Sequence, residues 1–169
     1  MSTDPTETDE FYWSCIEEAL DEVDIYTTGE SLSEGLSQFP EWVGDLLCVH
    51  WLLSEVQNGG LMQFFLNNTG VLAPEAEAAL RQMNLPEAAE ALNRALAILG
   101  FPYPRDKVDR YQILRARAGL KFEDMETQLW RAKLFQSMED QLDATGGSML
   151  RNLYVRMNEY ARQHDEAHA

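Results

Sequence analysis

The side chains of this 169-residue sequence that are numerous and closely spaced enough to suggest a chemical role are carboxylates. Closely spaced Asp and Glu residues serve as general acid–base pairs in enzymes, or they create a negative field that attracts basic partners. Catalytic use needs an environment that separates the two pKa values, whereas a solvated acidic helix supplies carboxylate pairs without any chemistry. Seven acidic residues fall between positions 9 and 24: Asp9, Glu10, Glu17, Glu18, Asp21, Glu22 and Asp24.

Other catalytic groups are sparse. His50 falls on a Trp- and Leu-rich helical stretch, and His164 and His168 lie close to the C-terminus. The glycine pairs at 59–60 and 146–147 lack the Lys-Ser/Thr that a phosphate-binding loop requires, and no Ser-centred nucleophile elbow is present. We therefore expect no catalytic residue, no metal or cofactor, and no enzyme activity.

The charge is distributed unevenly along the chain, whose formal net charge is −16. Residues 1–80 contain 16 Asp and Glu and no Lys or Arg, whereas residues 81–169 contain 13 acids and 13 bases. A surface that is merely acidic for solubility would be acidic throughout, so this asymmetry predicts one directional negative face. Such a face repels nucleic acid and membranes and attracts basic proteins.

The density of acids on the first helix resembles that of a nucleic acid. Six carboxylates between residues 10 and 24 span about 21 Å at roughly 1.5 Å per helical residue. This is on the order of one charge per 3.5–4 Å, close to the ~3.4 Å of a single DNA strand. A solvated acidic surface is the alternative interpretation. Further residues expected on the same partner-binding face are Glu30, Glu34, Glu41 and Asp45.

A second feature is a polar motif between residues 55 and 70. An apolar helix over 41–56 is followed by a glycine pair, which stops a helix because glycine tolerates positive φ. A short helix over 61–66 then ends at a second polar turn. Buried amides beside such turns usually satisfy freed backbone groups, so we expect a structural role. The motif positions are Glu55, Asn58, Gly59, Gly60, Gln63, Asn67 and Gly70.

The motif Glu-Val-x-Asn-Gly-Gly-x-x-Gln-Phe-Phe-x-Asn-x-Thr-Gly, followed by a helix over 75–83, resembles a family of small all-α proteins. This family was long a domain of unknown function, and it includes an acidic DNA-mimic protein. The close match covers about residues 51–100. The resemblance implies an all-α fold and a DNA-mimic role. It also implies that a homodimer could extend the charged surface.

Helical periodicity without sustained β-alternation predicts an all-α fold with about eight helices in one compact domain. We expect a disordered acidic tail over 1–8, a single domain over 9–162 and a frayed end over 163–169. A loop with one helical turn is expected over 29–39. The other expected helices cover 9–26, 74–83, 87–99, 106–118, 123–142 and the segment from Ser148 onward.

We expect a cytoplasmic protein. Its N-terminal residues lack the basic and apolar regions of a signal peptide, and its longest apolar run, residues 46–53, is too short to span a membrane. Cys15 and Cys48 have no C-x-x-C partner and fall in apolar helices, so we expect reduced core cysteines, with a disulfide as the alternative.

Basic residues cluster between positions 105 and 121. Arg110, Arg117 and Lys121 are expected on one helix face, opposite Leu114. No aromatic residues are interleaved for base stacking and the overall charge is negative, so a nucleic-acid patch is disfavoured. We expect these residues to neutralise acids within the chain or across a dimer.

Two functional hypotheses follow. In the first, the acidic face occupies the DNA-binding groove of a basic DNA-binding protein, such as a transcription factor or nucleoid protein, and blocks DNA binding. In the second, the protein is an immunity-type inhibitor of a single basic toxin, which would depend more on apolar hot spots. A non-catalytic acidic scaffold is a third alternative.

Overall fold

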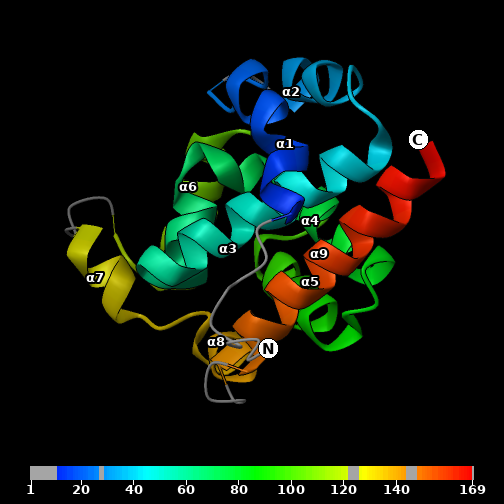
Figure 1. Ribbon diagram of the computed structural model, residues 1–169. Coiled ribbons are helices and arrows are strands. Elements are labelled where there is room, and N and C mark those ends of the chain that lie inside the picture. The colour runs from blue at the N-terminus through cyan, green and yellow to red at the C-terminus, as the bar shows by residue number, and fades with distance from the viewer. Residues whose placement is uncertain (1–10, 27–28, 122–125, 144–147, 169) are drawn as a thin grey trace.

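The computed structural model describes residues 11–26, 29–121, 126–143 and 148–168, and these contain helices but no strand, which confirms the all-α prediction (Figure 1). The elements are α1 (Phe11–Glu22), α2 (Gly29–Leu36), α3 (Glu41–Leu66), the 3₁₀ helix η1 (Asn68–Leu72), α4 (Ala73–Gln82), α5 (Pro86–Leu99), α6 (Lys107–Arg117), α7 (Glu126–Arg131), α8 (Gln136–Asp143) and α9 (Ser148–His168).

Helix α3 is the centre of the core. It packs against α1, α4, α6, α9 and η1, and Figure 1 shows it surrounded by these elements. Twelve of its 26 residues are buried apolar side chains, including Leu46 and Leu47 in its first half and Phe64 and Phe65 in its second. A helix that is apolar on nearly all sides has to be enclosed by others, which explains why the neighbouring helices need only one apolar face.

Three elements differ from the sequence-based expectation. Residues 29–36 form α2, where a loop was expected. The continuous helix expected over 123–142 is interrupted between α7 and α8, where Lys133 has a φ of 50°. This break lets Phe135 enter the core, where its ring centroid lies 5.0 Å from that of Phe65. Helix α9 continues to His168, so the end expected to fray from residue 163 is helical; the tail expected over 1–8 lies outside the described residues.

The glycine pair breaks α3 into two halves. Gly59 and Gly60 have non-helical backbone angles, and the φ of 75° at Gly60 favours glycine. The freed N–H of Leu61 donates to Oε1 of Glu139 on α8 at 2.8 Å. A Cβ at Gly60 would collide with this carboxylate, and one at Gly59 would collide with the side chain of Gln63. The positive φ thus requires glycine at position 60, and a side chain at either position would displace the polar side chain beside it.

Glu55 lies in the first half of α3 and organises the polar motif from inside the core. It is 8% exposed, and it accepts hydrogen bonds from Gln63 at 2.7 Å, Asn67 at 2.8 Å and Thr69 at 2.9 Å. A buried carboxylate with three donors is much less costly than an isolated one. The structure thus brings Glu55, Gln63 and Asn67 together, as their expected structural role requires, whereas Asn58 is exposed.

Arg110 of α6 closes the other end of the short helical segment. It is 1% exposed, and its guanidinium donates to the carbonyls of Phe65 (2.9 Å), Asn67 (2.9 Å) and Arg105 (2.5 Å). A cation at a helix C-terminus also interacts favourably with the helix dipole. A Cβ at Gly70 would approach the Phe64 carbonyl at 2.6 Å, so this position needs glycine for space.

The expected arrangement of the basic cluster is therefore wrong. Arg110 lies on the same buried face as Leu114, four residues later, and does not share an exposed face with Arg117. Its partners are backbone carbonyls of the core. Arg105 does neutralise an acid, forming two hydrogen bonds of 2.7 and 2.8 Å with Glu75.

We predict that Arg110→Met lowers the free energy of unfolding by roughly 2–4 kcal/mol, because the buried carbonyls at the end of α3 lose their donor. Lys107→Met is the matched control, since Lys107 is exposed on the same helix and should change stability by no more than about 0.5 kcal/mol. Urea denaturation followed by circular dichroism measures both. Equal stability of the two variants would contradict this role of Arg110.

Candidate protein-interaction site

The outer face of α1 carries exposed carboxylates. Tyr12, Ile16 and Ala19 turn inward, which leaves the acids on the opposite side in water. The backbone N–H of Tyr12 donates to the Asn158 side chain of α9 at 2.9 Å and so ties α1 to the body of the protein. The acids form two rows with four-residue spacing, which are Glu17 with Asp21 and Glu18 with Glu22.

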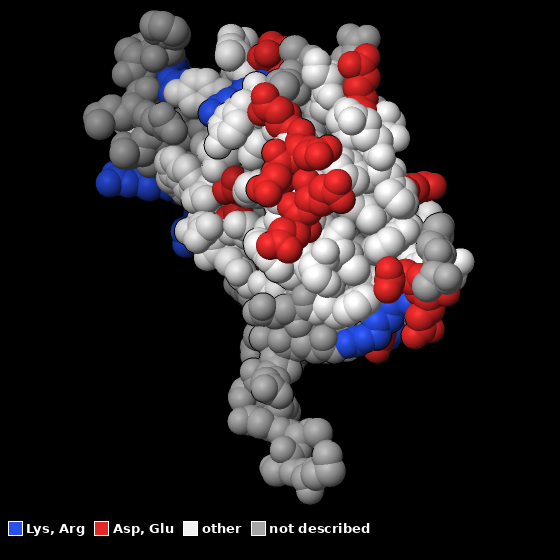
Figure 2. Space-filling model, turned by 45° about the horizontal axis from the view of Figure 1, so that its top comes forward, with Lys and Arg blue, Asp and Glu red and all other residues white. Residues whose placement is uncertain are grey.

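These acids belong to a larger acidic band. Asp24, just after α1, is exposed and accepts the backbone N–H of Tyr26 at 2.8 Å, and Glu34 of α2 is exposed as well. Figure 2 turns α1 and α2 toward the viewer and shows acidic side chains gathered on this face with no basic side chain among them. We call the carboxylates of Glu17, Glu18, Asp21, Glu22, Asp24 and Glu34 the acidic band.

Four acids of the band, Glu17, Glu18, Asp21 and Glu22, form no ion pair within the described part of the chain. Ion pairs of the described ranges include those of Arg81 with Glu77 and Glu90, of Arg105 with Glu75, and of Arg156 with Glu159. Like charges four residues apart on a helix repel each other, so the band stores a modest repulsion that a basic partner would relieve.

The remaining predicted carboxylates lie elsewhere. Asp9 and Glu10 lie outside the described residues, and Glu30 is on α2 with a side chain that is not described. Glu41 and Asp45 are on the first two turns of α3, where they line a cavity between α3, α4 and α9. Asp45 is half-buried, and burial raises the pKa of its carboxyl.

Aromatic residues next to the band were missed as candidates. Trp13 is 40% exposed and precedes Glu17 by one helical turn, and Tyr26 is 79% exposed just after Asp24. The four-residue spacing of Trp13 and Glu17 was the signal available in the sequence. Exposed aromatic rings beside charges are common energetic anchors in protein interfaces.

A cluster of aromatic rings lies between α1 and α3. The ring of His50 on α3 lies 5.1 Å from that of Trp13, 6.2 Å from Tyr12 and 5.8 Å from Trp51, measured between centroids. Burial lowers the pKa of His50, because the charged imidazolium loses hydration there. His50 is partly buried, and its ring packs between α3 and the rings of α1.

The described part of the chain lacks two other kinds of site. It contains no group of three or more His, Cys, Asp or Glu residues able to hold a metal ion. No helix in it combines the length and the apolar character that crossing a membrane requires. Cys15 and Cys48 are free thiols.

The fold and charge define a class, namely a small acidic all-α protein whose helix α1 presents exposed carboxylates on its outer face. The family model described as DMP19-like protein matches residues 37–164, so the chain belongs to the DMP19-like family. The polar motif over 55–70 lies inside this match, whereas α1 and α2 precede it. No curated protein and no solved structure matched the chain.

We predict that folding stability decreases as the pH falls below about 6.5 and that His50 causes part of this decrease. The unfolded chain takes up a proton near that pH, whereas the buried imidazole stays neutral until a lower pH, so acid favours the unfolded state. His50→Gln should remove this contribution. Urea denaturation of both proteins at about pH 8 and about pH 5.5 measures it. If the stability difference between them were the same at both pH values, His50 would not titrate in this way.

Proposed function

We propose that this protein is a non-catalytic cytoplasmic inhibitor that imitates the DNA backbone. Its acidic band would occupy the DNA-binding surface of a basic protein, such as a transcription factor or a nucleoid protein, and block DNA. One observation carries this proposal. The carboxylates of Glu17, Glu18, Asp21 and Glu22 are exposed in two rows on α1, and none of them forms an ion pair within the described residues.

The spacing of these carboxylates is close to the spacing of phosphates that a DNA-binding surface of the partner would bind. Residues four apart on a helix rise by about 6 Å, so the two rows together present one charge per ~3 Å of helix axis. A single DNA strand carries one phosphate per ~3.4 Å. Charge complementarity of this kind steers association and makes affinity sensitive to salt.

Membership of the DMP19-like family gives separate support, because the family that the motif resembles includes a DNA mimic. The family match does not include α1. The assignment of the acidic band is therefore based on the residues of this chain alone, and family membership supports only the type of function.

An immunity-type inhibitor of one basic toxin is the second candidate. The exposed rings of Trp13 and Tyr26 favour it, because a partner-specific inhibitor depends on apolar anchors that phosphate mimicry does not need.

An affinity experiment separates the two candidates. The protein is immobilised, host lysate is applied in low salt, and bound proteins are eluted with double-stranded DNA at constant ionic strength. Release of a DNA-binding protein supports mimicry, since DNA and the acidic protein then compete for one surface. Retention of a single protein that DNA does not displace supports the immunity-type inhibitor.

We predict that the triple variant Glu17→Lys, Glu18→Lys, Asp21→Lys weakens binding of the captured partner by at least about 100-fold, because it replaces attraction with repulsion at the centre of the band. Helicity should be retained, since all three side chains are exposed. Fluorescence anisotropy at two salt concentrations measures the affinity and its salt dependence.

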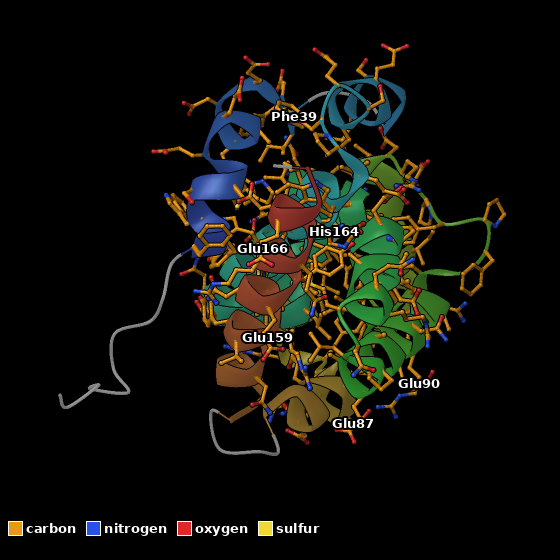
Figure 3. All side chains as sticks on the ribbon, turned by 45° about the vertical axis from the view of Figure 1, so that its right-hand side comes forward. Phe39, Glu87, Glu90, Glu159, His164 and Glu166 are labelled. Carbon is orange, nitrogen blue, oxygen red and sulfur yellow. The ribbon has the colours of Figure 1, made fainter. Side chains whose placement is uncertain are left out.

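The matched control reverses Glu87, Glu90 and Glu159 to Lys. Figure 3 shows Glu87 and Glu90 on α5, toward the end of the molecule opposite α1 and α2, and Glu159 on α9. Both triple variants reverse three of the same charges, so their net charge is equal. If the two variants bound the partner with similar affinity, binding would depend on the net charge of the protein and not on the acidic band. The assignment of the band as the binding face would then be wrong.

A further inference from the structure

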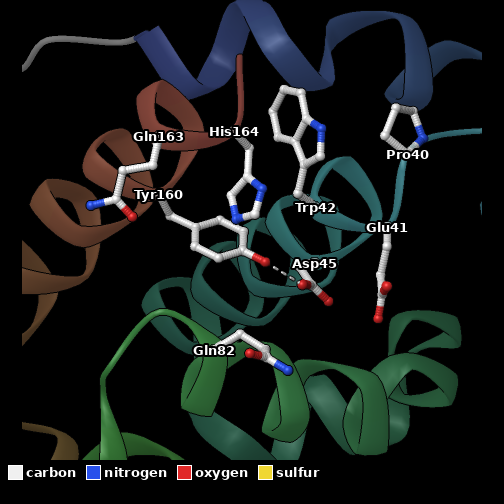
Figure 4. A pocket seen from close by; sticks show the side chains of 8 residues that line it. All are labelled: Pro40, Glu41, Trp42, Asp45, Gln82, Tyr160, Gln163 and His164. Atoms are coloured by element: carbon white, nitrogen blue, oxygen red, sulfur yellow. Dashed lines mark hydrogen bonds between the residues drawn. The ribbon is translucent and has the colours of Figure 1, made fainter. Parts of the chain in front are cut away.

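A cavity of about 510 Å³ lies between the start of α3, the end of α4 and the last turns of α9. Figure 4 shows Glu41 and Asp45 of α3 on one side, Tyr160 and His164 of α9 on another, and Gln82 of α4 across from them. The cavity is separate from the acidic band on α1, and all of its lining residues fall within the segment that matches the DMP19-like family.

Three aromatic rings form one wall of the cavity. The rings of Trp42 and His164 are nearly parallel, with an interplanar angle of 12° and centroids 6.0 Å apart. The ring of Tyr160 lies 4.5 Å from His164. Aromatic faces attract cations through their negative quadrupole, and planar cations can also stack on them.

Two carboxylates complete the cavity. Glu41 and Asp45 are four residues apart on α3 and therefore lie on the same side of the helix. Asp45 accepts a hydrogen bond of 2.7 Å from the hydroxyl of Tyr160, which fixes its orientation (Figure 4). No Lys or Arg is among the lining residues. Burial raises the pKa of Asp45 most, the hydrogen bond from Tyr160 lowers it, Glu41 raises it and His164 lowers it, with a net upward shift. A further cation beside Asp45 would therefore stabilise its carboxylate form.

We propose that this cavity binds an arginine side chain of the partner protein. A guanidinium is planar, so it can stack on the aromatic wall while its N–H groups donate to Asp45 and Glu41. A lysine ammonium is a strongly hydrated point charge that makes less use of flat rings. The identity of the occupant as a protein side chain rests on the proposed function, which calls for a basic partner.

This site would give the interaction a specificity that the band alone lacks. Exposed charges on α1 attract any basic surface, whereas an arginine enclosed by rings and carboxylates has to be at one position of the partner. Partly enclosed arginines are frequent hot spots of protein interfaces. The cavity thus acts as the short-range anchor, and the band supplies long-range attraction.

The test uses N-acetyl-arginine amide as the probe and N-acetyl-citrulline amide as its neutral control. The indole N–H signals of the four tryptophans are followed by nuclear magnetic resonance in about 0.15 M salt, where distant charges are largely screened. Trp42→Phe assigns the signal of Trp42. We expect the arginine derivative to shift this signal saturably, with a dissociation constant on the order of 1 mM, and citrulline to leave it unchanged.

Three variants connect the shift with the cavity. Asp45→Asn keeps an oxygen for the Tyr160 hydroxyl but removes the charge, and it should weaken probe binding about tenfold. Glu87→Gln removes one exposed charge far from the cavity and should change it less than about twofold. The α1 triple variant should bind the probe as the native protein does, because α1 does not line the cavity.

The proposal fails if the arginine derivative gives no saturable shift, if citrulline binds equally well, or if Asp45→Asn and Glu87→Gln have equal effects. Such a failure leaves the proposed DNA mimicry intact as long as DNA still elutes the captured partner. In the converse case, the arginine derivative binds as expected while DNA elutes no protein from the column. That result would support the arginine site and contradict the proposed DNA mimicry.

Discussion

The structure depends on satisfying the backbone groups that are freed where α3 breaks inside the core. Glu139 accepts the N–H of Leu61 at the start of the short segment over 61–66, and Arg110 donates to carbonyls at its end. A negative group at the N-terminus and a positive group at the C-terminus both match the helix dipole. Because these two residues come from α8 and α6, the break also joins the central helix to the second half of the chain.

The protein uses its acids in two distinct ways. Glu55 and Glu139 point inward, where neutral donors surround the first and a backbone N–H meets the second. The acids of α1 point outward and have no cationic partner in the described chain. Inward carboxylates therefore contribute to stability, whereas the outward ones cost repulsion that only an external cation offsets. This separation is the physical basis for a partner-binding face on a stable helical body.

The band and the cavity differ in range and in selectivity. Solvated charges act over about 8 Å at physiological salt, and they accelerate encounter with any basic surface. The cavity beside Asp45 and Tyr160 is partly enclosed, so its interactions are short-ranged and depend on shape. A partner that carries a basic groove and one well-placed arginine would satisfy both.

Local patterns in the sequence determined the helical fold, the turn at Gly59–Gly60 and the acid-rich outer face of α1, because each depends on residues within a few positions of one another. Even the burial of Arg110 was signalled by its spacing from Leu114, although the pattern was misinterpreted. The tertiary structure alone decided that Glu139 caps Leu61, 78 residues away, and that Tyr160 meets Asp45, 115 residues away. Periodicity specifies which face of a helix is apolar, but the packing of whole helices selects which distant polar groups meet.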